Sequence, residues 1–131
     1  MYLLDTNICI FLINKKPIYV LDRLRKEMRK GVCLSAISIG ELHYGACNSV
    51  HYEKNRIALA QFAAPFEILD FDGIDAEAYG KIRSDLKRRG MMIGPYDLQI
   101  AAQALRRDLV LVTNNTGEFS RIPGLKLEDW K

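Results

Sequence analysis

Short apolar runs alternate along the chain with longer segments of mixed character. Residues 1–4, 32–35 and 109–112 are mostly apolar runs of four, bounded by polar residues, glycine or helical segments. Runs of this length and setting predict buried strands. The partly alternating segment 66–71 predicts a third strand in chain order, and residues 125–127, after Pro123-Gly124, predict a last edge strand.

The longer segments carry apolar residues three or four positions apart, which is the spacing of a helix with one buried face. Pro17 and Pro95 suit the first helical position, because the N–H that proline lacks is unpaired there anyway. Four helices are predicted, over residues 17–30, 51–64, 75–89 and 95–107.

Ser38 and Glu41 have the spacing of a capping box, in which a hydroxyl and an acid three residues later each accept a backbone N–H. A fifth helix is therefore expected to begin at Ser38. The capping box gives Glu41 a structural explanation, and Asp97 has one too, since an acid in a first helical turn complements the helix dipole. Asp5 has no equally plain explanation, unless it caps a helix from Thr6 onward.

Strands that alternate with helices predict an α/β fold, here with a central, mostly parallel sheet of about five strands flanked by helices on both faces. A chain of 131 residues has the size of one domain. We find no repeat or composition boundary and predict a single domain over residues 1–131. The apolar run 8–13 and the aromatic positions Tyr44, Tyr52 and Phe62 are expected to belong mainly to the core.

The composition, 49% hydrophobic and 27% charged, is typical of a globular protein. Uncharged stretches such as Gly31–Gly40 are far shorter than the roughly 20 residues of a membrane helix. Asp5 falls where a secretory signal has its basic and apolar regions. We therefore expect a cytoplasmic protein without membrane contact. Three cysteines without a CxxC pair argue against a disulfide framework, and Cys9 and Cys33 are expected to be small buried hydrophobes.

The net charge of +3 is unevenly distributed. Basic clusters at 15–30 and 81–89 flank an acidic stretch at 67–77. Basic clusters suit a phosphate backbone, although they equally suit solvated helix faces. The candidate contacts to a nucleic-acid backbone are Arg25, Arg29, Lys87 and Arg88.

Acidic and polar side chains stand at the ends of several predicted elements. Asp5 ends the first strand, and Thr113 and Asn115 follow the strand before them, whereas Glu41 and Asp97 lie in first helical turns. A parallel sheet brings strand ends and helix starts to one edge, where open α/β sheets bind ligands. Carboxylates that converge repel one another unless a cation neutralises them. Because Mg²⁺ and Mn²⁺ prefer oxygen ligands, we predict a divalent metal site at this edge.

The chain contains four blocks of residues at these positions, Leu4-Asp5-Thr6-Asn7, Ser38-Ile-Gly-Glu41-Leu-His-Tyr-Gly45, Gly94-Pro-Tyr-Asp97 and Leu111-Val-Thr113-Asn-Asn115-Thr-Gly-Glu118-Phe119. In this order they resemble the signature blocks of PIN-domain ribonucleases and, more narrowly, of the VapC toxins of bacterial toxin–antitoxin pairs. The resemblance extends to the ending Leu127–Trp130. It is closest to the members that cut initiator tRNA in its anticodon region.

The resemblance implies the toxin of a type II toxin–antitoxin system, a ribonuclease that uses Mg²⁺, for which Mn²⁺ can substitute. It implies catalytic roles for Asp5, Glu41, Asp97, Asn115 and Glu118, with the metal at Asp5 and Asp97. Supporting roles fall to Thr6, Asn7 and Thr113. The implied partners are a VapB-type antitoxin, a second copy of the chain and, through the antitoxin complex only, operator DNA.

The chain departs from the family pattern at one position. Many PIN domains have an aspartate where this chain has Asn115, whose amide offers a carbonyl oxygen but no charge. The number of metal ions, one or two, therefore stays open, and we expect Glu118 to supply the missing negative charge.

Three alternative functions are compatible with the sequence. A phosphotransferase with Asp5 as nucleophile would use the same strand end, but such sites typically have a second acid two residues later, where this chain has Asn7. A binding module without catalysis would use the acids only as helix caps. A PIN-fold ribonuclease with another substrate, structured RNA or mRNA, would share the whole site.

Overall fold

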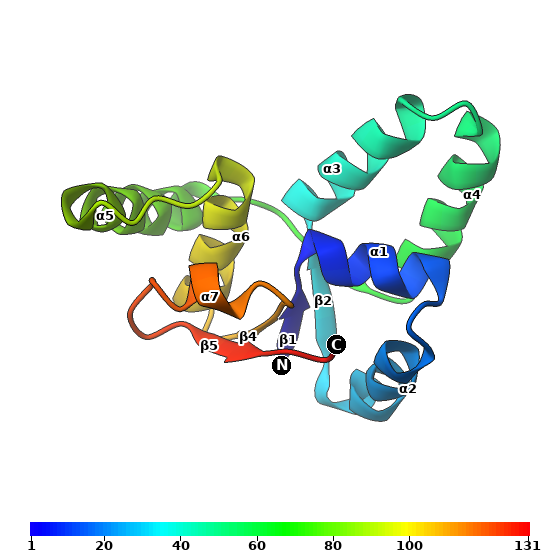
Figure 1. Ribbon diagram of the computed structural model, residues 1–131, viewed down its shortest axis with the longest axis horizontal. Coiled ribbons are helices and arrows are strands. Elements are labelled where there is room, and N and C mark those ends of the chain that lie inside the picture. The colour runs from blue at the N-terminus through cyan, green and yellow to red at the C-terminus, as the bar shows by residue number, and fades with distance from the viewer.

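Five short parallel strands form the centre of the computed structural model, which describes residues 1–131 (Figure 1). The strands are β1 (Tyr2–Leu4), β2 (Val32–Ser35), β3 (Glu67–Leu69), β4 (Val110–Val112) and β5 (Lys126–Glu128). They lie in the order β3-β2-β1-β4-β5, and every neighbouring pair is parallel. The predicted α/β fold is confirmed, with β5 at an edge and with a sheet that is wholly rather than mostly parallel.

Seven helices surround this sheet. They are α1 (Thr6–Asn14), α2 (Ile18–Glu27), α3 (Ala36–Cys47), α4 (Tyr52–Ala63), α5 (Gly73–Arg89), α6 (Pro95–Arg106) and α7 (Thr116–Phe119), and a 3₁₀ turn, η1 (Met28–Lys30), follows α2. In Figure 1, α1 to α4 lie to the right of β1 and β2, and α5 to α7 lie to the left. None of these helices has the length and apolar character needed to cross a lipid bilayer.

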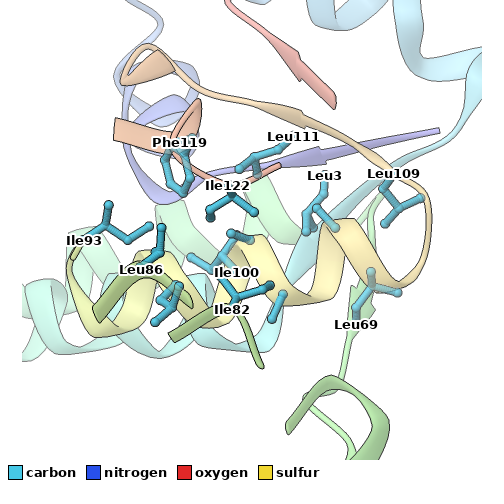
Figure 2. Packing of buried hydrophobic residues seen from close by; sticks show 14 of the residues in the cluster. Leu3, Leu69, Ile82, Leu86, Ile93, Ile100, Leu109, Leu111, Phe119 and Ile122 are labelled. Carbon is cyan, nitrogen blue, oxygen red and sulfur yellow. The ribbon is translucent and has the colours of Figure 1, made fainter. Parts of the chain in front are cut away.

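Successive residues of β1 face opposite sides of the sheet, as the pleat requires. They therefore belong to two separate hydrophobic cores, one on each face of the sheet. Leu3 packs with residues of α5, α6 and α7, including Leu86, Ile100 and Phe119 (Figure 2). Tyr2 and Leu4 pack instead with residues of α1 and α2. Both faces of the sheet are therefore covered. The two cysteines expected to be buried hydrophobes are Cys33, in the first core, and Cys9, in the second.

Helix α1 is the element that the sequence pattern did not single out. Its run Ile8–Ile13 is apolar throughout, so the helical period cannot be seen in it. The structure buries Ile8, Cys9 and Leu12 at helical spacing and leaves Ile10 exposed. The helix begins where it does because Asp5 Oδ1 accepts the Ile8 N–H at 2.9 Å, which makes Asp5 the N-cap.

Two predicted helix starts are wrong by three residues, and Pro17 is the N-cap of α2 and not its first residue. Helix α3 begins directly after β2, with Ser35 as its N-cap and the Ile37 N–H donating to Ser35 Oγ at 3.0 Å. Ser38 and Glu41 therefore form no capping box. At α5 the N-cap is Asp72, which forms a capping box with Asp75. In both cases the sequence offers two suitable N-cap residues three positions apart, Ser35 and Ser38 or Asp72 and Asp75. The helix begins at the first of the two, which is nearer to the end of the preceding strand.

The expected burial of the aromatic side chains is also partly wrong. Phe62 is half-buried, but Tyr44 and Tyr52 are exposed. Tyr44 lies on α3 and Tyr52 at the start of α4, two helices that extend away from the sheet (Figure 1).

Helix α6 is held in place by polar contacts in and just after its C-terminal half. Buried Asp75 of α5 pairs with Arg107, just after α6, at 2.9 Å. Buried Gln103 donates to the Leu69 carbonyl of β3 at 3.3 Å and accepts a hydrogen bond from Ser35 Oγ at the end of β2. Since burying polar groups without partners is costly, these contacts fix α6, and with it Asp97, relative to the sheet.

Candidate active site

The edge of the sheet at the carboxyl ends of β1, β2 and β4 collects most of the predicted residues. Asp5 directly follows β1, and Thr113 directly follows β4. Helix α3, with Glu41, starts at the end of β2, and α6 ends shortly before β4, so its first turn with Asp97 lies at the same edge. The topology therefore brings four separate segments together, as the strand-end argument predicts.

Asp5 is the most buried acid of this group, only 3% exposed. Burial raises its pKa to about 6. Hydrogen bonds from the Thr113 side chain and the Ile8 N–H oppose this rise, and the negative charges of Asp97 and Glu41 add to it. Asp5 thus has both a capping role and a place in the acidic group.

Glu41 is positioned by a tertiary hydrogen bond. Thr6 Oγ1 lies 3.1 Å from Glu41 Oε1 and 3.0 Å from Ser38 Oγ. A hydroxyl has one proton, so both bonds form when buried Ser38 donates to Thr6 and Thr6 donates to the Glu41 carboxylate. Partial burial raises the pKa of Glu41, the Thr6 hydrogen bond lowers it, and the charge of Asp97 raises it again.

Asp97 interacts electrostatically with the last acidic candidate. Partial burial raises its pKa, and the neighbouring charge of Glu118 raises it further. Glu118 lies in α7, whose N-cap residue is Asn115. The Asn115 side chain makes no capping hydrogen bond, and its backbone N–H donates to Thr113 Oγ1 at 2.9 Å. The Asn115 amide is therefore free to contact a ligand.

None of the carboxylates of Asp5, Glu41, Asp97 and Glu118 forms an ion pair with a lysine, arginine or histidine. Uncompensated carboxylates that raise one another's pKa values favour a bound cation. All the available donors are oxygens, which suits Mg²⁺ or Mn²⁺ rather than zinc.

The acids do not form a cage for such an ion. No three histidine, cysteine, aspartate or glutamate side chains lie close enough together to hold a metal. The expectation that three carboxylates meet in one place is therefore too strong. Two carboxylates still fit the usual pattern for Mg²⁺, which is held by one or two carboxylates and completes its shell with water and substrate phosphate.

Glu41 stands between two hollows in the surface. The first, the α1 cleft, has a volume of about 410 Å³ and lies between α1, α3 and α4. The second, the tyrosine hollow, has a volume of about 500 Å³ and lies between α3 and α6. The α1 cleft is lined by Thr6, Asn7, Ile10, Ile13 and others, and the tyrosine hollow by Ala36, Ile37, Gly40, Tyr44 and Tyr96. Glu41 contributes to both.

The four candidate contacts to a nucleic-acid backbone lie away from the acidic group. Arg25 lies on α2, and Arg29 precedes the start of β2, at the opposite edge of the sheet. Lys87 and Arg88 are exposed in the last turn of α5, and the connection over residues 90–94 separates them from α6. The structure does not bring these residues next to the carboxylates, and their role stays a prediction.

Three residues of this region are not among the predicted site residues. The sequence pattern favours a capping role for Ser38 and a place in the core for Tyr44, and Tyr96 belongs to the block Gly94–Asp97 without a predicted role. The available signal was helical spacing, because Ser38, Glu41 and Tyr44 follow one another at intervals of three on α3 and so lie near one face.

Comparisons with known proteins show the family of this chain and its fold. Residues 2–125 match the PIN domain family. The chain is 43% identical to the tRNA(fMet)-specific endonuclease VapC of Shigella flexneri and 44% identical to that of Salmonella typhimurium, in each case over 129 residues, 98% of this chain and 97% of the relative. Its fold is similar to that of VapBC2 from Rickettsia felis, solved with a DNA fragment of the promoter, with a TM-score of 0.95 and 40% identity over 99% of this chain and 98% of that one. The chain therefore belongs to the PIN-domain family and, within it, to the VapC ribonucleases.

Proposed function

We propose that this protein is the toxin of a VapBC system and inhibits translation and growth by cutting initiator tRNA in the anticodon stem-loop, in the cytoplasm. The observation that carries the proposal is the group of four carboxylates without a cationic partner, at the ligand-binding edge of a parallel sheet. The substrate is argued from two relatives at 43% and 44% identity whose names specify tRNA(fMet).

Asp5 and Asp97 are the proposed ligands of a divalent cation, Mg²⁺ or Mn²⁺. Their carboxylates are the two most buried of the acidic group, and the negative charge of Asp97 raises the pKa of Asp5. When bound, such an ion supplies positive charge to the phosphate oxygens and lowers the pKa of a coordinated water. Asn115 follows β4 at the same edge of the sheet. Its side-chain amide, which is free of protein partners, donates a hydrogen bond to a phosphate oxygen.

Glu41 is the proposed general base. Partial burial raises its pKa, which makes the carboxylate a stronger base and suits a group that takes up a proton in the reaction. Thr6, itself held by Ser38, aims the carboxylate. Water attacks the phosphorus and gives its proton to Glu41, the bond from phosphorus to the 3′ oxygen breaks, and that oxygen takes a proton from solvent. The products are a 5′-phosphate and a 3′-hydroxyl.

The proposed partner is a VapB-type antitoxin, since the solved relatives include VapBC complexes, one of them with promoter DNA. We assign the antitoxin segment to the α1 cleft, where Ile10, Ile13, Leu42 and Leu59 offer an apolar surface beside Glu41. A segment seated there covers the general base. Operator DNA is contacted only through the complex, and the toxin itself is expected to form a homodimer.

The test is to incubate the purified protein with total tRNA and Mg²⁺ and to map the cut ends. One dominant cut in the anticodon region of initiator tRNA, with a 5′-phosphate and a 3′-hydroxyl, supports the proposal. EDTA and the Asp97→Asn variant should abolish the cut. The matched control is Asp22→Asn, an exposed acid on α2, which should cleave like the wild type. Cleavage of mRNA or another RNA in place of initiator tRNA would overturn the substrate assignment.

A further inference from the structure

Two exposed tyrosines frame the hollow on the side of Glu41 opposite the α1 cleft. Tyr44 of α3 is 73% exposed and Tyr96 of α6 is 57% exposed. Neither hydroxyl makes a hydrogen bond within the protein, and neither ring packs against another aromatic ring or a cationic side chain. Large aromatic rings without any partner of their own are available to a ligand.

Two small residues, Ala36 and Gly40, line the tyrosine hollow beside Tyr44. Ala36, Gly40 and Tyr44 follow one another at intervals of four on α3 and so lie on one face. A side-chain carbon added at Gly40 would meet nothing within 4 Å. The space beside the Tyr44 ring is therefore open, and a flat group can lie against the helix there.

The position of the hollow links it to the proposed reaction. Glu41 lines the hollow, and Tyr96 directly precedes Asp97. A nucleotide whose phosphate lies at the carboxylates has its base within reach of this space. Glu41 is the only charged residue in the lining, so the hollow suits an uncharged flat group and not a phosphate.

We propose that the tyrosine hollow binds the base of a nucleotide next to the scissile phosphate, stacked on Tyr44 and Tyr96. This inference rests on the proposed ribonuclease function. Proteins commonly hold unpaired RNA bases by stacking them on aromatic side chains, and the anticodon loop offers such bases. Apart from Glu41 and the two phenol groups, the lining offers no polar side chain to the edges of a base. The hollow therefore holds a base by its face and tolerates different bases.

The experiment combines protein variants with altered RNA. The variants are Tyr44→Ala and Tyr96→Ala, the conservative Tyr44→Phe and Tyr96→Phe, and Tyr52→Ala as matched control, since Tyr52 is an exposed tyrosine on α4 outside the hollow. The substrates are synthetic RNA stem-loops that contain the mapped cut site, either intact or with an abasic nucleotide on one side or the other of the cut. The readout is kcat/KM for each pair.

We expect each alanine variant to lower kcat/KM on intact RNA by about 5- to 100-fold, the range that corresponds to one stacked base. The phenylalanine variants and Tyr52→Ala should cleave like the wild type. One abasic substrate should be cut poorly by the wild type, and on it the alanine variants should show no further loss. Exchanging the base at that position for another should change the rate little.

The outcomes separate this inference from the function on which it rests. If the wild type cuts no RNA, the proposed function fails. If the wild type cuts RNA but the alanine variants match it, the inference is wrong. It is also wrong if the losses from alanine and from the abasic nucleotide multiply. Alanine variants that cleave normally but fail to dimerise or to bind antitoxin, measured by light scattering, would assign the hollow to a protein partner and overturn the inference.

Discussion

Thr6 Oγ1 lies 3.1 Å from Glu41 Oε1, and this contact joins the first turn of α1 to the middle of α3. The same hydroxyl lies 3.0 Å from Ser38 Oγ. Since Thr6 follows Asp5 in the chain, one segment both supplies a proposed metal ligand and sets the direction of the proposed base. The two roles are therefore mechanically coupled through the start of α1.

Replacing Thr6 by valine keeps the shape of the side chain and removes the hydroxyl. We expect the cleavage rate to fall by at least about tenfold. A general base accelerates a reaction by a factor on the order of 10²–10⁴, and without the Thr6 hydrogen bond the Glu41 carboxylate would no longer be held in its orientation. The pKa of Glu41 should rise, because the Thr6 hydrogen bond lowers it, so the acid side of the pH–rate profile should move to higher pH. The Thr6→Ser variant should restore both. A Thr6→Val enzyme with an unchanged profile would refute the role.

The parts of the site that follow from local rules could be predicted from sequence. Asp5 and Thr113 each come directly after an apolar run, and that pattern alone placed both at one edge of a parallel sheet. Asp97 follows a proline that suits a helix start, and α6 does begin at Pro95.

The rest depended on contacts between distant segments. The Ser38–Glu41 spacing fits a capping box, but it equally fits two residues that share a partner on another helix, and only the fold decides between these. Helix α1 could not be recognised from the sequence, because the run Ile8–Ile13 is apolar on every side of the helix, including the exposed side with Ile10, and so shows no helical period. The distance of Arg29 from the carboxylates follows from the direction of β2 and could not be seen in a charge cluster.

Asp5→Asn should separate the two roles of this residue. Asparagine is a good N-cap, so α1 should be preserved, whereas Asp5→Ala should cost about 1 kcal/mol of stability. The raised pKa of about 6 means that burial of the charged form costs stability. The folded state binds the proton more tightly, so this contribution is favourable below the usual aspartate pKa and is lost as the pH rises through about 6.

At pH 7.5 in EDTA, Asp5→Asn should therefore unfold at higher urea concentration than the wild type, with a gain of up to about 3 kcal/mol. The same variant should cleave no RNA. The control is the same pair measured at pH 4.5, where the wild-type carboxyl is protonated and the difference should shrink. An Asp5→Asn variant that is equally stable at both pH values would contradict the buried-charge explanation.

Divalent cations should stabilise the wild type in a pH-dependent way. Mg²⁺ or Mn²⁺ competes with protons for Asp5 and Asp97, whose pKa values are both raised. The increase in Tm on adding the cation should be clear at pH 7.5 and much smaller at pH 5. Asp97→Asn should show little increase at either pH, and Ca²⁺ or Na⁺ at matched ionic strength serves as control. An equal shift at both pH values would place the cation elsewhere.

Asn115→Asp should change the binding of the cation more than the fold. Asn115 lies at the start of α7, its side chain makes no capping bond, and an added carboxylate there would extend a group that already includes Asp97 and Glu118. Greater negative charge attracts a divalent ion and raises the pKa values of its acidic neighbours. We expect tighter binding of Mn²⁺, by about tenfold, in calorimetric titrations, with a stoichiometry that reports whether a second ion enters. Asn114→Asp, an exposed neighbour that adds the same charge, should change the affinity far less. If both variants bind Mn²⁺ with equal affinity, the gain in affinity comes from net charge alone, and Asn115 does not lie next to the bound ion.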